Sequence, residues 1–255
     1  SRTALQKRLI GHRGCSPVAE NLMHLAEIQT VWEGPPQCEN CGIRHLVLFS
    51  SLEQDDFALI HEPIAERRFE KGKALYREGD PGDHVFTVRE GIIKLVRYAE
   101  NGEERVVRLL RRGDVAGLEA LLGQPYHHEA IPLDPALTCR IPVRVINDLN
   151  RRLPYFHHEL MTRWQQAVNA ADAWLTELGT GPVKARVARL LLRLAEAEPG
   201  DTCFMPTRED IGSMLAVTTE SVSRATAEFK RSGVIEYVGP HRVKVKIDGL
   251  KWFSD

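Results

Sequence analysis

Two cysteines three positions apart, Cys38 and Cys41, form the clearest chemical motif of this 255-residue chain. A Cys-x-x-Cys pair presents two thiolates that can bind zinc, ligate an iron–sulfur cluster or exchange a disulfide. The chain holds five cysteines, an odd number that is too sparse for a disulfide scaffold. The cysteine usage therefore predicts a cytoplasmic protein whose clustered thiols serve metal or redox chemistry.

A second constellation, Glu220-x-x-Ser223-Arg224, lies near the carboxyl end. Arginine can donate two hydrogen bonds to guanine, glutamate can accept one from cytosine, and serine can take either role. Between positions 224 and 246 there are six basic and two acidic residues, whereas the whole chain has a formal net charge of −1. This local surplus predicts contacts with the phosphates of double-stranded DNA. The expected DNA-binding residues are Thr219, Glu220, Ser223, Arg224, Lys230, Arg242 and Lys244.

The elements that must position these residues are three helices followed by a hairpin, within residues 181–255. Thr207 and Asp210 form a capping box at the start of the second helix, and Thr218 caps the third. Alternating residues in 234–238 and 242–247 predict a two-stranded basic hairpin in which Ile247 faces inward. Two helices joined by a short turn and followed by such a hairpin predict a winged helix-turn-helix.

A long helix is expected over residues 155–178, within a segment that runs from 151 to 180. Its apolar residues recur at steps of four, three, four and three, which is the period of a coiled-coil seam. A narrow apolar stripe with polar flanks predicts that the helix pairs with the same helix of a second copy, giving a homodimer. The predicted seam residues are Trp164, Val168, Ala171, Leu175 and Leu178.

Upstream, residues 51–150 show short alternating strands punctuated by glycines, which predicts an antiparallel barrel or roll. Residues 1–50 form an amino-terminal extension with an expected helix from Ser16 to Trp32, followed by a Gly-Pro-Pro break. The predicted class is therefore α+β. No apolar run approaches the roughly 20 residues of a membrane span, so no membrane association is expected.

These features resemble those of the CRP/FNR family of transcription regulators. Residues 205–235 resemble the family's helix-turn-helix, and the Gly113-Asp-Val-Ala-Gly117 segment resembles a turn of its β-roll. The resemblance implies a roll of the cyclic-nucleotide-binding type, a dimerisation helix and a DNA-binding domain, without enzymatic activity. It also implies contact with RNA polymerase. Glu220, Ser223 and Arg224 resemble the Glu-x-x-Ser-Arg of FNR-type recognition helices, which implies a palindromic DNA site with TTGAT half-sites.

The cysteines resemble those of the oxygen-sensing FNR-type branch. That branch carries a Cys-x-x-Cys pair before the roll and a distant cysteine in a segment like Thr138-Cys139-Arg140-Ile141-Pro142. The resemblance implies a 4Fe–4S cluster on Cys38, Cys41 and Cys139. A fourth family cysteine is missing, because residues 46–49 there read Leu-Val-Leu-Phe. Cys15 could fold back as the fourth ligand, or His45 or a small molecule could take that place.

A cyclic nucleotide is not expected to bind the roll. The cAMP-binding relatives hold the ribose with a glutamate and the phosphate with an arginine pair. Here Glu119 is one place late, and residues 124–129 contain no arginine. His127 and His128 are interpreted as polar loop residues. Two hypotheses about the function therefore remain open. The first is a cluster-bearing regulator that responds to oxygen or nitric oxide. The second is a cluster-free regulator that senses thiol oxidation or a small ligand.

Overall fold

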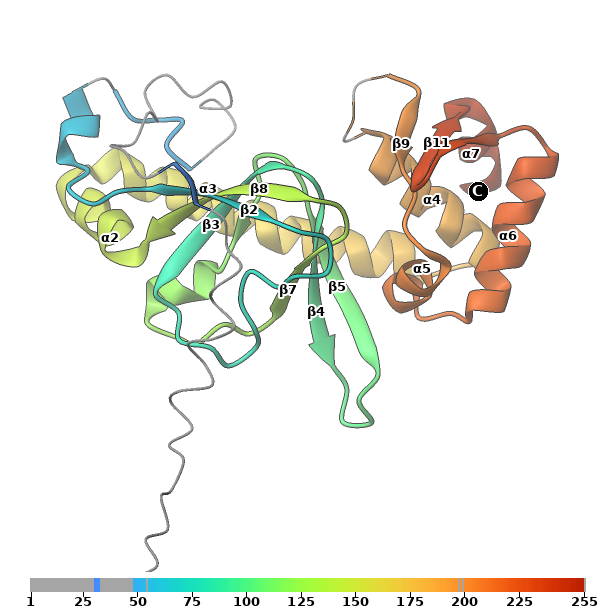
Figure 1. Ribbon diagram of the computed structural model, residues 1–255, viewed down its shortest axis with the longest axis horizontal. Helices are drawn as coiled ribbons and strands as arrows, with labels where there is room; N and C mark the ends of the chain where they lie inside the picture. Colours follow the sequence, from blue (N-terminus) through green and yellow to red (C-terminus); the bar gives the residue numbers. More distant parts are fainter. Residues whose placement is uncertain (1–29, 33–47, 54, 197, 199, 255) are drawn as a thin grey trace, which may run out of the picture.

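The computed structural model describes residues 30–32, 48–53, 55–196, 198 and 200–254 (Figure 1). Cys15, Cys38, Cys41 and His45 lie outside the described residues. The chain runs from a β-roll through a long helix into a helical C-terminal unit, and helix α3 passes along the roll toward that unit (Figure 1). The predicted class, α+β with a roll, a long helix and a winged helix-turn-helix, is confirmed.

Two antiparallel sheets form the roll. The larger has the strand order β1-β2-β8-β3-β6, with β1 Thr30–Trp32, β2 Ala65–Phe69, β8 Ala136–Pro142, β3 His84–Glu90 and β6 Val115–Ala116. The smaller has the order β5-β4-β7, with β5 Glu104–Leu110, β4 Ile93–Tyr98 and β7 Glu129–Pro132. The short helices η3 (Asp55–Leu59) and η4 (Leu118–Leu122) complete this part.

Aromatic side chains fill the space inside the roll. Tyr76 and Tyr126 stack with ring centroids 3.8 Å apart, and Phe86 packs beside Tyr76. A second apolar cluster lies against the other face of the larger sheet and contains Leu48 and Phe49, both at most 2% exposed. The segment that follows the cysteine-bearing residues is therefore part of the core of the roll.

The amino-terminal helix predicted to end at Trp32 is wrong at that end. Thr30–Trp32 form strand β1, which pairs antiparallel with β2. Thr30 and Val31 are β-branched and favour a strand when a free sheet edge is available. The edge belongs to β2, which lies more than thirty residues away in the sequence, so local pattern did not reveal it.

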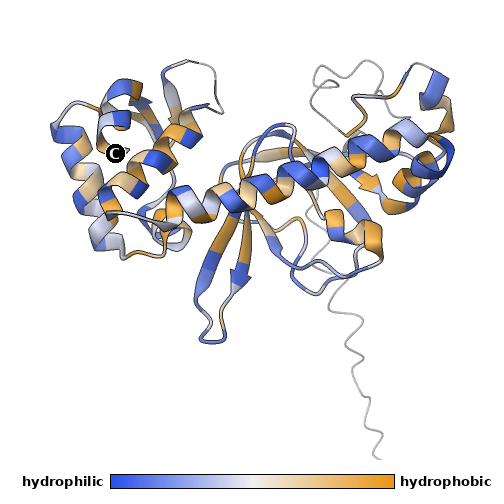
Figure 2. Ribbon diagram, turned by 180° about the vertical axis from the view of Figure 1, so that it is seen from behind, coloured by the Kyte–Doolittle hydropathy of each residue, from blue (hydrophilic) through white to orange (hydrophobic). Residues whose placement is uncertain are grey.

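The long helix begins one residue earlier than expected and changes its winding before its end. α2 (Val143–Arg152), which was not predicted, spans the expected boundary at 150, and Leu153 separates it from α3 (Pro154–Ala173). A π-helical turn, η5 (Trp174–Leu178), follows α3. Seen from behind, α3 carries alternating apolar and polar residues along its length (Figure 2).

Leu178 does not lie on the exposed stripe, which corrects the predicted seam. It is 1% exposed and packs with Trp174 in the core of the C-terminal unit. The π-helical turn has a different period from the α-helix, so the step of three from Leu175 to Leu178 rotates Leu178 away from the stripe.

The C-terminal unit contains α4 (Val183–Glu196), α5 (Arg208–Leu215), α6 (Thr219–Arg231) and α7 (Ile247–Ser254). Its sheet has three strands rather than two, in the order β10 (Ile235–Gly239), β11 (Arg242–Val245) and β9 (Thr202–Phe204).

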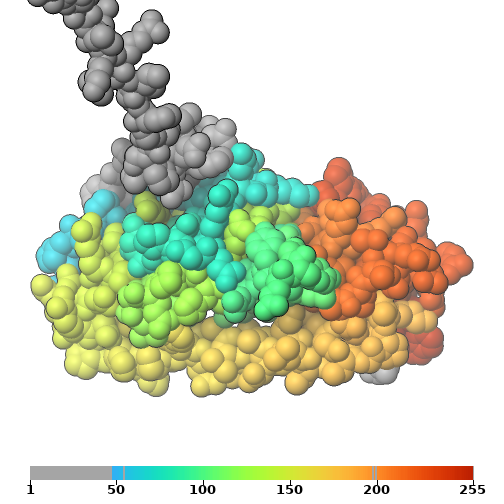
Figure 3. Space-filling view, turned by 90° about the horizontal axis from the view of Figure 1, so that it is seen from below, coloured from blue at the N-terminus to red at the C-terminus, as the bar shows by residue number. Residues whose placement is uncertain are grey.

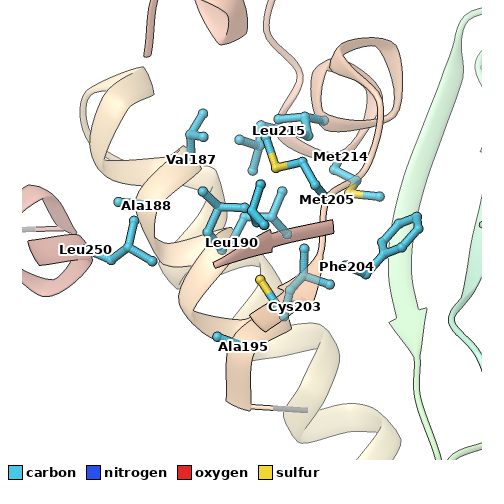
Figure 4. Close-up of a cluster of buried hydrophobic side chains, with 14 of the residues drawn as sticks. Val187, Ala188, Leu190, Ala195, Cys203, Phe204, Met205, Met214, Leu215 and Leu250 are labelled. Carbon is cyan, nitrogen blue, oxygen red and sulfur yellow. The ribbon is translucent and has the colours of Figure 1, made fainter. Parts of the chain in front are cut away.

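Ile247 begins α7 and is 37% exposed, so its expected inward orientation is wrong. Leu190, Met214 and Leu215 converge with Cys203 in the core (Figure 4). No helix in the described ranges has the length and apolar character to cross a membrane.

Candidate functional site

The two helices of the helix-turn-helix are capped as their sequence predicts. Thr207 Oγ1 accepts from the Asp210 N–H at 3.0 Å, and Thr218 Oγ1 accepts from the Ser221 N–H at 3.3 Å. A Cβ on Gly212 would come within 2.9 Å of the Val217 carbonyl oxygen, so glycine lets the turn pack closely against α5. The caps and this close approach fix the angle between α5 and α6.

Helix α6 buries one face and exposes the other. Phe229 and Val222 are 0% exposed and anchor the helix in the core. On the opposite side, Thr219, Glu220 and Arg224 are exposed and Ser223 is half-buried. The four predicted base-reading residues therefore lie together near the amino end of one helix, with side chains that solvent can reach.

An ion pair orients the exposed face of α6. The Arg224 Nη2 and Glu220 Oε1 atoms are 3.4 Å apart, and the two side chains are 72% and 76% exposed. At such exposure the pair contributes little to stability. Its effect is to hold the guanidinium beside the carboxylate, so that both groups face outward together.

The three predicted phosphate-binding cations have different surroundings. Lys230 lies 6.0 Å from the centroid of the Tyr237 ring. Lys244 pairs with Asp201 at 2.8 Å, and Arg242 pairs with Glu198. Both acids belong to the segment around β9, which lies outside the 224–246 window in which basic residues were counted. No local sequence pattern indicates these pairs, because they depend on the β11–β9 pairing.

Cys139 is the one predicted sulfur ligand inside the described ranges. It lies half-buried on β8, the central strand of the larger sheet, and packs against the cluster that contains Leu48. Its Cα pairs with that of Glu66 on β2, and Glu66 in turn pairs with Trp32 on β1. The Trp32 backbone, before the Cys38–Cys41 segment, is therefore two strands away from Cys139, and Leu48, after that segment, belongs to the cluster against which Cys139 packs.

The Glu119 carboxylate interacts with two neighbouring histidines. Its Oε1 accepts from the His127 N–H at 2.9 Å and lies 3.9 Å from His128 Nδ1. Burial alone raises the pKa of this carboxyl, but hydrogen bonds from His128 and the His127 N–H outweigh burial and lower the pKa to about 2. In the part of the chain that the structure describes, no cluster of three or more His, Cys, Asp or Glu side chains could hold a metal ion.

Cys203 is placed for packing. The side chain is 0% exposed, and burial raises the pKa of its thiol to about 12. A thiol that stays protonated and buried is a poor nucleophile and a poor ligand.

An exposed apolar stripe runs along α3 and η5. Met161, Val168 and Leu175 are 47%, 51% and 69% exposed and follow one another at intervals of seven. Trp164 and Ala171, which were predicted at intervening positions, are half-buried, and Trp164 packs on the roll. Met161 was missed because the seam was traced only from Trp164 onward, although the same heptad extends back to it.

Comparisons with known proteins agree with this architecture. Residues 66–152 match the family model described as a cyclic nucleotide-binding domain, and residues 185–251 match a Crp-like helix-turn-helix domain.

Regulatory protein HlyX of Actinobacillus pleuropneumoniae is 26% identical over 220 residues, which cover 84% of this chain and 92% of that protein. The fumarate and nitrate reduction regulatory protein of Vibrio cholerae is 24% identical over 211 residues, covering 80% and 84%. A CRP-family transcriptional regulator of Thermus thermophilus has a solved structure similar to this one, with a TM-score of 0.64, 25% identity and coverage of 73% and 95%. These relatives are transcription regulators, not enzymes.

Proposed function

Because the chain belongs to the CRP/FNR family of transcription regulators, we propose that it acts as a homodimer on a palindromic DNA site with TTGAT half-sites. We propose further that an iron–sulfur cluster makes this binding respond to oxygen, redox state or nitric oxide. The observation that carries the DNA part is the exposed face of α6, where Glu220 and Arg224 are paired outside the core and Ser223 lies beside them.

Base recognition is assigned to that face. Arg224 donates to guanine, Glu220 accepts from cytosine, and Ser223 and Thr219 contact neighbouring groups. Lys230, Arg242 and Lys244 contact phosphates, which requires the latter two to exchange Glu198 and Asp201 for the DNA backbone. Two copies are needed to read two half-sites, and the stripe of Met161, Val168 and Leu175 supplies the dimer contact.

The sensor part depends on Cys139 and the segment that contains Cys38 and Cys41. Neighbouring strands lie about 4.8 Å apart, so two strand spacings put the Trp32 Cα roughly 10 Å from the Cys139 Cα. Cys38 is six positions after Trp32, and an extended chain covers about 3.3 Å per position. Both thiols of the pair can therefore reach Cys139, and three thiolates are a donor set that suits iron–sulfur chemistry.

The cysteines would hold the cluster, and Cys15 is proposed as the fourth ligand, with His45 or a small molecule as the other candidates. When bound, an iron–sulfur cluster supplies iron and sulfide that react with oxygen or nitric oxide. The chain's own contribution is to tie the amino-terminal segment to β8. Ser50, nine residues after Cys41, donates to Glu159 on α3 at 3.2 Å, which links this segment to the dimerisation helix.

A second candidate is a cluster-free regulator of the same family that senses thiol oxidation or a small ligand. A cyclic nucleotide is not the proposed ligand, because Glu119 is already engaged by His127 and His128. Contact with RNA polymerase is proposed on the strength of the family alone.

The DNA part is tested by fluorescence anisotropy with a duplex that carries the palindrome and with a scrambled duplex, using anaerobically purified protein. Arg224→Ala is expected to cost about 1–3 kcal/mol on the palindrome and to relax the preference at the guanine. Lys230→Ala, the control, should weaken binding to both duplexes alike and reduce the salt dependence. Equal losses on both duplexes for Arg224→Ala would refute direct readout.

The fourth ligand is tested by iron and sulfide analysis of Cys15→Ser. If Cys15 ligates iron, the variant assembles less cluster or loses it faster in air, since a soft ligand is missing. Unchanged iron, sulfide and anaerobic DNA binding would instead support a site with three cysteines. Cys203→Ala is the control, because that thiol is buried in the C-terminal core and alanine adds no polar group there.

A further inference from the structure

A buried lysine connects the roll to the DNA-binding unit. Lys94 lies on β4 with its side chain 11% exposed, and its Nζ donates to Glu104 Oε1 at 2.7 Å and to Asp210 Oδ1 at 2.9 Å. Glu104 belongs to β5 of the roll, whereas Asp210 lies in the first turn of α5. One ammonium group therefore bridges a carboxylate from each of the two units.

The contact is embedded in an apolar interface. The first four residues of β4 and the residue before it are buried on both faces: Ile93 and Leu95 pack inside the roll, while Ile92 and Val96 belong to the core cluster of the C-terminal unit. Lys94 alternates with Ile92 and Val96 and so shares their face. Strand β5 contacts α5, and the green surface of the hairpin adjoins the orange surface of the C-terminal unit (Figure 3).

Asp210 is also part of the cap of α5. Its Oδ2 accepts from the Thr207 hydroxyl at 2.7 Å, while its N–H donates to Thr207 Oγ1 at 3.0 Å. Lys94 thus holds the starting turn of the first helix of the helix-turn-helix. Burial alone lowers the pKa of Lys94, but hydrogen bonds to Glu104 and Asp210 outweigh it, so the pKa is raised and the lysine stays charged.

Two further polar contacts between the described parts of the units do not pair opposite charges. The Lys71 Nζ lies 2.9 Å from His241 Nε2 in an exposed setting, and Arg111 Nη1 donates to the Arg193 carbonyl at 2.7 Å. Charges that are shielded from water interact more strongly than exposed ones, and removal of one partner leaves the others buried without compensation. The Lys94–Asp210 contact is therefore the one whose loss should change the relation between the units most.

We propose that Lys94 and Asp210 form an alignment latch that holds the helix-turn-helix in a fixed orientation on the roll and keeps it ready for DNA. In this latched arrangement α6 lies on the side of the C-terminal unit away from the roll, and its predicted base-reading face is exposed (Figure 1). The latch consequently does not cover the DNA-binding face. It lowers the conformational entropy that is lost when DNA binding fixes the two units relative to each other. Its effect on DNA binding rests on the proposed function, whereas its effect on the motion of the two units does not.

The latch is tested by hydrogen–deuterium exchange and DNA affinity of the full chain, with Lys94→Met and Asp210→Asn. Both variants should exchange about tenfold faster at β4 and at the first turn of α5, and should bind the palindromic duplex about tenfold more weakly, a typical coupling between sites. Lys184→Met is the control for loss of a lysine–carboxylate pair that does not join the two units. It removes a 2.8 Å pair with Glu228 that lies entirely within the C-terminal unit, and it should leave β4 and DNA affinity unchanged.

A neutral triple variant, Lys94→Met with Glu104→Gln and Asp210→Asn, guards against failure to fold, because it leaves no uncompensated buried charge. It should retain the fold and still show faster exchange. Exchange equal to that of the wild type would overturn the latch. Faster exchange with equal or tighter DNA binding would overturn the alignment role and indicate an inhibitory contact. A wild-type chain that does not distinguish the palindrome from the scrambled duplex would refute the proposed function and leave the exchange comparison decisive for the latch.

Discussion

Val168→Glu tests the proposed dimer most sharply. Val168 lies at the middle of the exposed stripe, between Met161 and Leu175, and is 51% exposed in the single chain. Across a two-fold axis the residue meets its own copy or a close neighbour, so each substitution enters the interface twice. A carboxylate there loses the valine contact and introduces two like charges in an apolar seam.

The magnitude follows from the exposed fraction of the side chain. Complete burial of a valine contributes about 1.5–3 kcal/mol, so burial of the exposed half contributes roughly 1 kcal/mol per copy. Burial of an unpaired charge costs about 3–5 kcal/mol, although the carboxylate avoids part of this cost by turning toward water. A total loss of about 4 kcal/mol raises the dimer dissociation constant about 1000-fold.

Sedimentation velocity at micromolar concentration measures the result. Wild-type protein should sediment as a dimer and Val168→Glu as a folded monomer with wild-type circular dichroism. Leu122→Glu is the control, since Leu122 is 65% exposed but lies on η4 of the roll, away from the stripe. A dimer for Val168→Glu, or monomers for both variants, would refute the assignment of the stripe.

Two further predictions concern stability. Phe229→Ala should lower the free energy of unfolding by about 3–5 kcal/mol in urea, because a fully buried ring that anchors α6 is removed; a loss near zero would contradict the packing. The Glu119 carboxyl, whose pKa is lowered to about 2, should stabilise the fold above the pKa of the unfolded chain and lose this effect as the pH falls toward 2. The difference in unfolding free energy between wild type and Glu119→Gln should therefore shrink between pH 5 and pH 3; a constant difference would show that the lowered pKa does not contribute to stability.

The parts of the fold encoded by local pattern were predictable. Caps at Thr207 and Thr218, the exposed face of α6 and most of the long helix follow from short-range spacing and side-chain chemistry. The β4–β5 hairpin also follows from its Asn101-Gly102 turn, in which Gly102 adopts a φ of +79°. In each case the deciding interactions lie within a few residues of one another.

The remainder depends on partners that are distant in the sequence. Strand β1 forms because it can pair with the edge of β2. Lys244 forms an ion pair with Asp201 because β11 pairs with β9. The Lys94 ammonium donates to Asp210, which is 116 positions away in the sequence, so no local pattern indicates that contact. Leu178 leaves the predicted seam because a π-helical turn changes the period, and sequence spacing alone assumes a constant one.

The proposed dependence of DNA binding on the cluster is tested by comparing DNA affinity before and after exposure to air. Protein reconstituted anaerobically with iron and sulfide should bind the TTGAT palindrome and then lose affinity when oxygen is admitted, in step with the loss of absorbance near 400 nm. Cys139→Ser should assemble no stable cluster and should bind weakly under both conditions, whereas Cys203→Ala should respond to air as the wild type does. Equal affinity with and without oxygen, together with a fully active Cys139→Ser, would contradict the cluster-dependent function.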